Sequence, residues 1–169
     1  MVAKAKFKKQ NHQTPTIPDW DKYFMSIAQV VKTRGNCLLK QVGVVLVKDK
    51  RIIATGYNGT PAGVKNCLDG GCLRCSLKNK GKLKSGEQKG TCLCVHAEVN
   101  SVIQSAYWGT STKGSKLYTT LHPCMLCAKE LINAGVEELY YMEEDNGEKE
   151  SLALLRKSLN RVKRITLKP

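Results

Sequence analysis

The spacing of hydrophobic residues predicts alternating helices and strands along most of the chain. Apolar residues recur at spacings of four, three and four from Trp20 to Val31, which predicts a helix that Asp19 caps. A continuous apolar run at 42–47 predicts a buried strand. By the same criteria we predict strands at 51–57, 116–120, 138–142 and 162–167, and helices at 95–106, 123–134 and 149–160.

The order of these elements predicts an α/β fold in which a mixed sheet of about five strands is covered by helices. Two segments lack a comparable pattern. Residues 1–17 are polar, basic and proline-containing, which predicts a disordered arm. Residues 62–94 form a Cys-, Gly- and Lys-rich insertion without clear periodicity. We therefore predict a single domain at 18–169 that contains this insertion.

The charge and the distribution of apolar residues bear on which partners and which cellular location we expect. The formal net charge is +14, concentrated in the N-terminal arm, the insertion and the C-terminal segment, and these basic runs do not interleave aromatic residues apart from the single Phe7 of the arm. Aromatic residues provide the surfaces on which single-stranded nucleic acid stacks, so we expect basic surfaces that attract phosphorylated small molecules and no nucleic-acid partner. Because no long apolar run predicts a membrane span or a secretory signal, we expect a cytoplasmic protein; the acid-poor arm leaves nuclear and mitochondrial destinations open.

Two short motifs carry the strongest functional signal, H-A-E at 96–98 and P-C-M-L-C at 123–127. Either motif alone is weak, because H-x-E is usually a surface pair and C-x-x-C also suits a redox pair or half of a structural zinc site. Together they form the signature of zinc-dependent nucleobase deaminases. His96, Cys124 and Cys127 can supply one nitrogen and two thiolates to a catalytic zinc, whose fourth position stays open for water.

Glu98 is the candidate general acid/base. Residues two apart on a helix do not share a face, so we do not expect Glu98 to be a fourth ligand beside His96. It can instead move a proton between water and the base. We expect Pro123 at the first position of the second ligand helix, where no N–H is needed, and the positive end of that helix would stabilise thiolates.

Six further cysteines predict a second metal site. Eight cysteines without a secretory signal favour metal binding over disulfides. A long loop with few apolar residues cannot be held by core burial, whereas a tetrahedral thiolate zinc would staple it. Cys94 precedes His96 by two residues, so this zinc would brace the start of the catalytic helix, and we expect two zinc ions per chain. Spacing does not say which four cysteines bind, and reduced thiols are the alternative, with a small core residue as the alternative for Cys37. The six are Cys37, Cys67, Cys72, Cys75, Cys92 and Cys94.

From about Trp20 to Leu167 the chain resembles the deoxycytidylate deaminases. The segment G-Y-N-G-T-P at 56–61 separates this family from other deaminases that share H-A-E and P-C-x-x-C. The resemblance implies a three-layer cytidine-deaminase-like fold and zinc-dependent hydrolysis of dCMP to dUMP, which feeds thymidylate synthesis. It also implies a homohexamer that dCTP activates with Mg²⁺ and dTTP inhibits. The other matching segments are R-G-N-C at 34–37, V-G-V-V-L-V at 42–47, H-A-E-V-N at 96–100 and P-C-M-L-C at 123–127.

The resemblance also assigns roles to individual residues. It places Cys37, Cys67 and Cys94 on a second, structural zinc, with Cys75 as the fourth ligand and Cys72 or Cys92 as its alternatives. The effector site maps onto Asn58 and Gly59. From the residues themselves, Asn58 also suits a turn, Tyr118 also suits a strand core and His122 also suits solvent. The substrate contacts that we expect are Asn58, Ala97, Tyr118, Thr120 and His122.

Two other functions compete with this interpretation. A tRNA adenosine deaminase shares the zinc motifs, and the positive charge would suit RNA, but G-Y-N-G-T-P and the six extra cysteines argue against it. A non-catalytic zinc or nucleic-acid-binding module has no use for an acid/base next to its metal, so Glu98 argues against that function.

Overall fold

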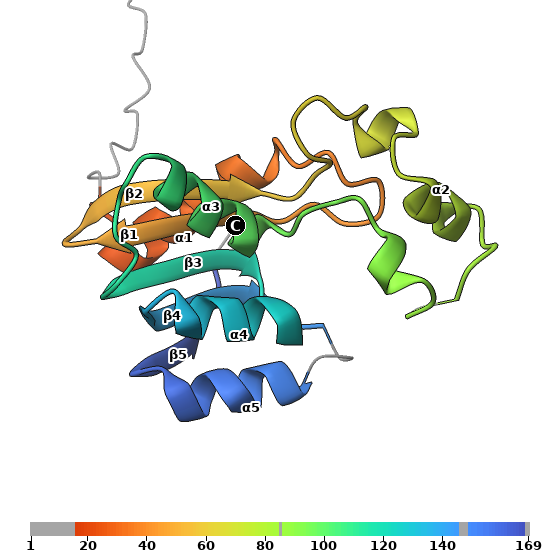
Figure 1. Ribbon diagram of the computed structural model, residues 1–169. Coiled ribbons are helices and arrows are strands. Elements are labelled where there is room, and N and C mark those ends of the chain that lie inside the picture. The colour runs from red at the N-terminus through yellow and green to blue at the C-terminus, as the bar shows by residue number, and fades with distance from the viewer. Residues whose placement is uncertain (1–15, 85, 146–148, 168–169) are drawn as a thin grey trace, which may run out of the picture.

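The computed structural model describes residues 16–84, 86–145 and 149–167. Its centre is a mixed five-stranded sheet in the order β2–β1–β3–β4–β5, in which β1 pairs antiparallel with β2 and β3, and the remaining pairs are parallel (Figure 1). The strands are β1 Gly43–Lys48, β2 Arg51–Tyr57, β3 Ser115–Leu121, β4 Val136–Glu143 and β5 Arg161–Arg164. The α-helices are α1 Trp20–Lys32, α2 Leu73–Asn79, α3 Ala97–Tyr107, α4 Met125–Asn133 and α5 Lys149–Ser158, with 3-10 turns η1 Cys67–Asp69 and η2 Lys89–Thr91.

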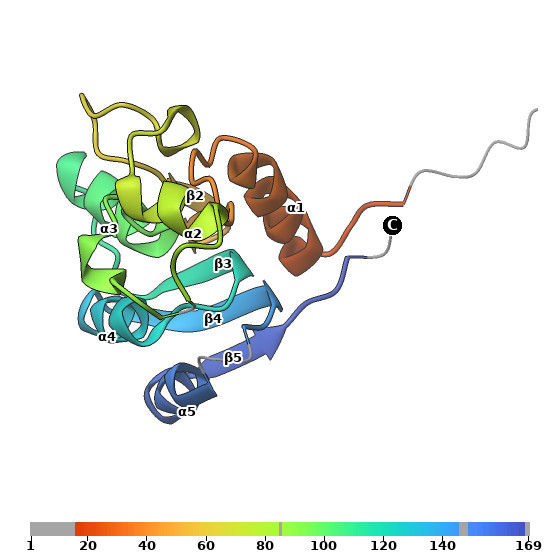
Figure 2. The ribbon, with the colours of Figure 1, turned by 90° about the vertical axis from the view of Figure 1, so that its right-hand side faces the viewer.

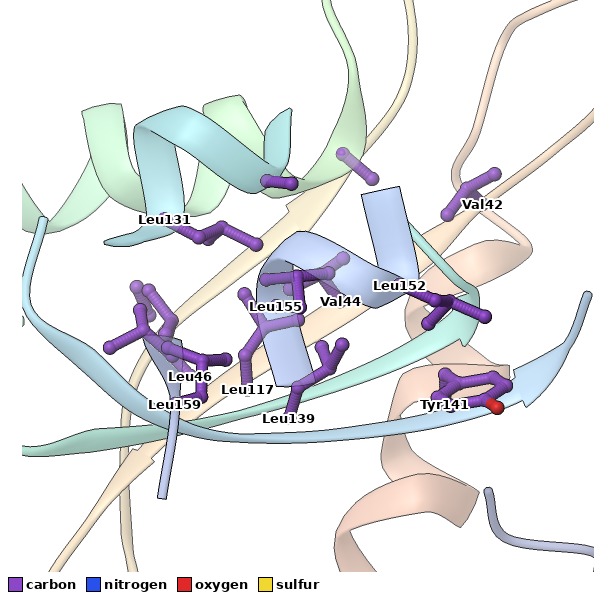
Figure 3. Packing of buried hydrophobic residues seen from close by; sticks show 14 residues of the cluster. Val42, Val44, Leu46, Leu117, Leu131, Leu139, Tyr141, Leu152, Leu155 and Leu159 are labelled. Carbon is purple, nitrogen blue, oxygen red and sulfur yellow. The ribbon is translucent and has the colours of Figure 1, made fainter. Parts of the chain in front are cut away.

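Alternate residues of the central strands face two hydrophobic cores. On β1, Val44 and Leu46 pack with α3, α4 and α5, whereas Val45 and Val47 pack with α1. Tyr118 of β3 belongs to the core on the α1 side. Figure 2 shows α1 on one face of the sheet with α4 and α5 on the other, and Figure 3 shows the larger core. The predicted α/β fold with helices covering a mixed sheet is therefore confirmed as three layers.

Most predicted elements match the structure, and three differ. The insertion contains a helix, α2, that its pattern did not predict, because Leu73 is 70% exposed and the apolar residues follow no helical period. Pro123 precedes Cys124, the N-cap of α4, so our placement of this proline inside the helix was wrong. Strand β5 ends at Arg164, earlier than predicted. The prediction for the arm falls largely on residues 1–15, which lie outside the described residues. Over the described part of the chain, the helices are too short or too polar to cross a bilayer.

Gly56 allows β2 to approach α3 closely, and its substitution should destabilise the protein. A Cβ atom at Gly56 would lie 2.0 Å from the carbonyl oxygen of Ala97 and 2.7 Å from the amide nitrogen of Ser101. Because both contacts are backbone atoms of α3, the helix and the strand would have to separate. We expect Gly56→Ala to lower the free energy of unfolding by about 1–3 kcal/mol, as overpacking does elsewhere, measured by urea denaturation.

Gly90→Ala is the matched control for Gly56→Ala. A Cβ atom at Gly90 meets nothing within 4 Å, so the same chemical change should leave the unfolding midpoint nearly unchanged. Equal midpoints for the two variants would contradict the role given to Gly56.

Candidate functional site

Two helices begin at the same point of the structure, and each begins with a predicted metal ligand. His96 is the N-cap of α3 and Cys124 is the N-cap of α4, and neither side chain forms a capping hydrogen bond with its own helix. The two side chains instead face each other, with His96 Nδ1 3.4 Å from Cys124 Sγ. The chain before α3 is held by a pair of hydrogen bonds between Val95 and Gly59, so the turn after β2 fixes the position of His96.

The donor set fits a zinc ion. Cys127, in the first turn of α4, completes the group of three donors. Its Sγ lies 3.2 Å from His96 Nδ1 and 3.6 Å from Cys124 Sγ. Tetrahedral zinc would separate its ligands by roughly 3.5 Å for a nitrogen–sulfur pair and roughly 3.8 Å for two sulfurs. Hydrogen bonding with Cys127 and then with His96 lowers the pKa of Cys124 to about 3, so this sulfur is a thiolate. Three protein donors leave one tetrahedral position for a non-protein ligand.

Glu98 lies beside this group and is not part of it. Its side chain is buried, and it lines the same cavity as His96 and Cys124. Burial raises the pKa of Glu98 to about 7. A carboxyl group with such a pKa can accept and release a proton at neutral pH, which suits a general acid/base.

The cavity in front of the metal group is formed by segments that are far apart in the sequence. The loop before β1, the end of β2, the insertion, the start of α3 and the end of β3 all contribute to it. Predicted site residues that line it are Asn58, Ala97 and His122, together with Cys37, Cys75, Cys92 and Cys94 of the second cysteine group.

Asn58 lines the cavity, and its side chain also forms hydrogen bonds with the backbone of another segment. Its side-chain oxygen accepts a hydrogen bond from the N–H of Val42 at 2.8 Å, and its side-chain nitrogen donates to the carbonyl of Lys40 at 2.7 Å. These bonds join the end of β2 to the segment that enters β1. The described backbone does not place Asn58 in a left-handed turn, so this structural role differs from the turn that the sequence suggested, and its substrate contact stays a prediction.

His122 presents a donor without a protein partner. Its Nδ1 accepts a hydrogen bond from the N–H of Asp145 at 2.9 Å, so Nε2 carries the proton. The residue is 3% exposed, and Nε2 has no partner within the described part of the chain. A buried N–H without a partner is costly, and an oxygen of a bound ligand would satisfy it. The solvent interpretation of His122 was wrong.

Three other predicted contacts lie away from the cavity. Tyr118 is buried on the α1 side of the sheet, where its ring stacks on Tyr140 at 4.7 Å and its hydroxyl donates to Asp21. Its interpretation as a core aromatic is correct and its substrate contact is not supported, because alternate strand residues face opposite sides. The hydroxyl of Thr120 accepts from the N–H of Gly43 and also does not line the cavity. Gly59 lines a separate surface hollow.

Arg74 is a cavity residue that the sequence did not reveal. It lies in α2, is 8% exposed, and lines the cavity that contains Glu98. Its Nε donates to the carbonyl of Glu87 at 3.0 Å, and no carboxylate among the described residues forms an ion pair with it. A buried guanidinium without a counter-ion favours an anionic ligand. No local pattern marks this residue, because only the fold of the insertion brings it to the site.

The six remaining cysteines gather as predicted. The structure brings the predicted ligands Cys37, Cys67, Cys75 and Cys94 into one group whose sulfur atoms all lie within 4.8 Å of one another. The two alternatives, Cys72 and Cys92, adjoin this group. All eight cysteines are free thiols, in keeping with metal binding over disulfides.

Comparison with known proteins agrees with the motifs. A family model described as the cytidine and deoxycytidylate deaminase zinc-binding region matches residues 18–143. The chain is 39% identical over 140 residues to the deoxycytidylate deaminase of Schizosaccharomyces pombe, which covers 82% of this chain and 41% of that protein. It is 36% identical over 151 residues to that of Saccharomyces cerevisiae, which covers 88% of this chain and 46% of that protein. The chain thus spans less than half the length of these two relatives.

A solved structure has a similar fold. The dCMP deaminase of the cyanophage S-TIM5, crystallised in complex with dCMP and dUMP, superimposes with a TM-score of 0.71 at 29% identity. The match covers 89% of this chain and 100% of the phage protein. The predicted cytidine-deaminase-like fold is therefore confirmed.

Proposed function

Because this chain belongs to the cytidine and deoxycytidylate deaminase family, we propose that it hydrolyses dCMP to dUMP and ammonia. The observation that carries the proposal is one cavity lined by the metal donors His96 and Cys124, by the buried carboxyl group of Glu98 and by the Arg74 guanidinium, which has no carboxylate partner among the described residues. The first two perform the chemistry, and the third selects a phosphorylated substrate. The resemblance of the complete sequence pattern to the two fungal enzymes supports the same substrate.

The reaction adds water to C4 of the cytosine, forms a C–O bond and breaks the C–N bond to the amino group. His96, Cys124 and Cys127 would hold zinc, which as a Lewis acid makes water a better nucleophile at neutral pH. Glu98 accepts one proton from the water and delivers it to the ring nitrogen, then takes the proton of the hydroxyl added at C4 and gives it to the amino group, which leaves as ammonia. The buried surroundings of Glu98 favour this shuttle, because its pKa near 7 makes both directions accessible.

The cavity also contains groups suited to a 5′-phosphate. Arg74 is a buried cation that no carboxylate of the described residues pairs with, and a phosphate can accept two hydrogen bonds from one guanidinium. Lys40 lines the same cavity, where its ammonium group lies 3.9 Å from the carboxylate of Asp145, so the pair itself is neutral. The Nε2–H of His122 is a third donor. We propose that these residues distinguish dCMP from deoxycytidine.

Removal of the Arg74 guanidinium should weaken use of the nucleotide and spare the nucleoside. A hydrogen bond to a charged group contributes about 1.5–3 kcal/mol, so we expect Arg74→Gln to lower kcat/KM for dCMP by roughly 10- to 100-fold. The weak turnover of deoxycytidine should not change, because the nucleoside offers no phosphate. The measurement is steady-state kinetics with both substrates at one enzyme concentration.

Arg51→Gln provides the matched control, since Arg51 is an exposed arginine of β2 that does not line the cavity. It should leave the ratio of the two kcat/KM values unchanged. A proportional loss with both substrates in Arg74→Gln would instead assign this residue a structural role.

We further propose that the product supplies dUMP for thymidylate synthesis, and that the enzyme is a hexamer activated by dCTP with Mg²⁺ and inhibited by dTTP. These expectations come from the family resemblance. The surface hollow that contains Gly59 supports a subunit contact, because large exposed apolar residues surround it. They are Tyr57, Val64, Ile103, Tyr107 and Trp108.

The proposal is tested by incubating the purified full chain with dCMP, deoxycytidine, dCTP and a tRNA anticodon stem. We expect dUMP to form from dCMP, with the rate altered by added dCTP or dTTP. Turnover of the RNA without turnover of dCMP would replace the proposal with tRNA adenosine deamination. Absence of turnover with every substrate, in protein that contains its metal, would favour a non-catalytic zinc module.

A further inference from the structure

Six cysteines outside the catalytic group converge from separate segments of the chain. Cys37 follows α1, Cys67 opens η1, Cys72 and Cys75 flank the start of α2, and Cys94 precedes α3. These five are buried, and Cys92 packs against them. Leu68, Leu73 and Leu93 of the insertion are each about half or more exposed, and the leucines that pack against the cysteines, Leu38 and Leu39, lie outside the insertion. The sulfur atoms themselves therefore form the interior of this segment.

The six sulfur atoms fall into two overlapping groups of four. One group is Cys37, Cys67, Cys75 and Cys94, and the other is Cys72, Cys75, Cys92 and Cys94. Within each group every sulfur lies within 4.8 Å of the others. Cys75 and Cys94 belong to both groups, so the two groups share a pair of sulfur atoms.

Two sulfur–sulfur distances within the second group suit metal coordination. The sulfur of Cys92 lies 3.9 Å from that of Cys72 and 3.7 Å from that of Cys75. A tetrahedral zinc with Zn–S bonds of 2.3 Å separates its sulfur ligands by roughly 3.8 Å. The sulfur atoms of Cys72 and Cys92 therefore lie where ligands of a zinc ion would lie.

We propose that this cluster holds two zinc ions, with Cys75 and Cys94 as bridging thiolates and the other four cysteines as terminal ligands. Six thiolates and two Zn²⁺ ions give a net charge of −2, which equals that of one zinc with four thiolates. The second ion therefore adds no uncompensated charge to the buried site. It also uses every cysteine in the insertion, whereas a single zinc leaves two of them without a ligand role.

Each of the two cysteine groups accepts a hydrogen bond from a backbone N–H. The N–H of Leu38 points at the sulfur of Cys67 at 3.3 Å, and the N–H of Leu93 points at the sulfur of Cys72 at 3.5 Å. Such N–H···S contacts stabilise thiolates, and each half has one at a terminal cysteine. The second half of the cluster thus has the same support as the half that the sequence predicted.

This cluster also positions part of the cavity. Cys75 and Arg74 are adjacent in α2 and both line the cavity, as does Cys94, which precedes His96 by two residues. Two zinc ions sharing Cys75 and Cys94 would tie α2 and the start of α3 to one rigid unit. The site is distinct from the catalytic group, because all of its ligands are fixed and none of its positions is open.

The test is the zinc content of the full chain and of two matched double variants. We expect three zinc ions per wild-type chain, counting the catalytic ion. Cys72→Ser with Cys92→Ser should leave two, and Cys37→Ser with Cys67→Ser should also leave two, because each pair removes the terminal ligands of one ion. Two zinc ions in the wild type, unchanged when Cys72 and Cys92 are replaced, would overturn the proposal in favour of a single structural ion. Two zinc ions in the wild type, unchanged when Cys37 and Cys67 are replaced, would also overturn the proposal.

X-ray absorption of the zinc-loaded wild type covers the case in which both variants fail to fold. Two metal ions joined by two thiolates produce a short zinc–zinc scattering path that isolated sites lack. We expect this path in the wild type. Its absence would overturn the proposal whatever the behaviour of the variants, and neither measurement depends on which substrate the enzyme takes.

Discussion

The Glu98→Gln variant is expected to keep its full zinc content and to lose deamination of dCMP by roughly 10³- to 10⁴-fold, near the upper end of what general acid–base catalysis supplies. The metal donors His96, Cys124 and Cys127 are untouched by the change. Glutamine has nearly the same shape as glutamate, so the cavity keeps its form. It cannot carry the proton from water to the ring, and this single defect accounts for the loss.

The measurement combines metal analysis with steady-state kinetics on dCMP. Glu150→Gln is the matched control, because Glu150 is the second residue of α5 as Glu98 is the second residue of α3, but it is exposed. The control should retain the wild-type rate. Wild-type activity in Glu98→Gln would refute the acid/base role, and loss of zinc in this variant would show that Glu98 acts through the metal.

The catalytic group was predictable from sequence because its chemistry is local. His96 and Glu98 are two residues apart, and Cys124 and Cys127 occupy one turn at the start of a helix. Such a spacing identifies the group even when the predicted tertiary arrangement is wrong. The fold was predictable for a similar reason, since the continuous apolar run along β1 specifies a strand buried on both faces before any partner is known.

The cavity wall was less predictable, because it depends on which face of an element meets the site. Tyr118 was expected near the substrate, but it belongs to the core on the α1 side of the sheet. His122 and Leu121 lie just beyond, where the chain leaves β3, and both line the cavity. A shift of one residue along a strand moves a side chain from the core face of the sheet to the face with the site, and the spacing of the motifs does not show which face a residue takes.

The insertion was the least predictable part. Its helix α2 is short and has no apolar stripe, and Arg74 lies in the sequence between Cys72 and Cys75, which belong to the cysteine groups. The spacing of the cysteines predicted metal, but it could not show that Cys75 and Cys94 serve two groups at once. Sharing of ligands is a property of three-dimensional arrangement, so only the structure raises the expected zinc count from two to three.

Loss of a catalytic ligand should have the opposite signature to loss of the acid/base. In Cys127→Ala we expect one zinc ion fewer per chain and a rate of dCMP deamination lowered at least as far as in Glu98→Gln, by more than about 10³-fold. Cys127 is fully buried in the first turn of α4, and the remaining donors, His96 and Cys124, hold zinc weakly as a pair.

The adjacent Leu126→Ala variant is the control, because Leu126 is 57% exposed, does not line the cavity and supplies no ligand. It should keep both its zinc and its activity. The combination of Cys127→Ala with Glu98→Gln adds a sharper requirement. If metal and carboxyl group act on the same water, the double variant should be no slower than the worse single variant, since groups that work as a unit are strongly non-additive. Multiplied losses in the double variant would show that Glu98 contributes independently of the metal, and full zinc content in Cys127→Ala would remove this cysteine from the ligand set.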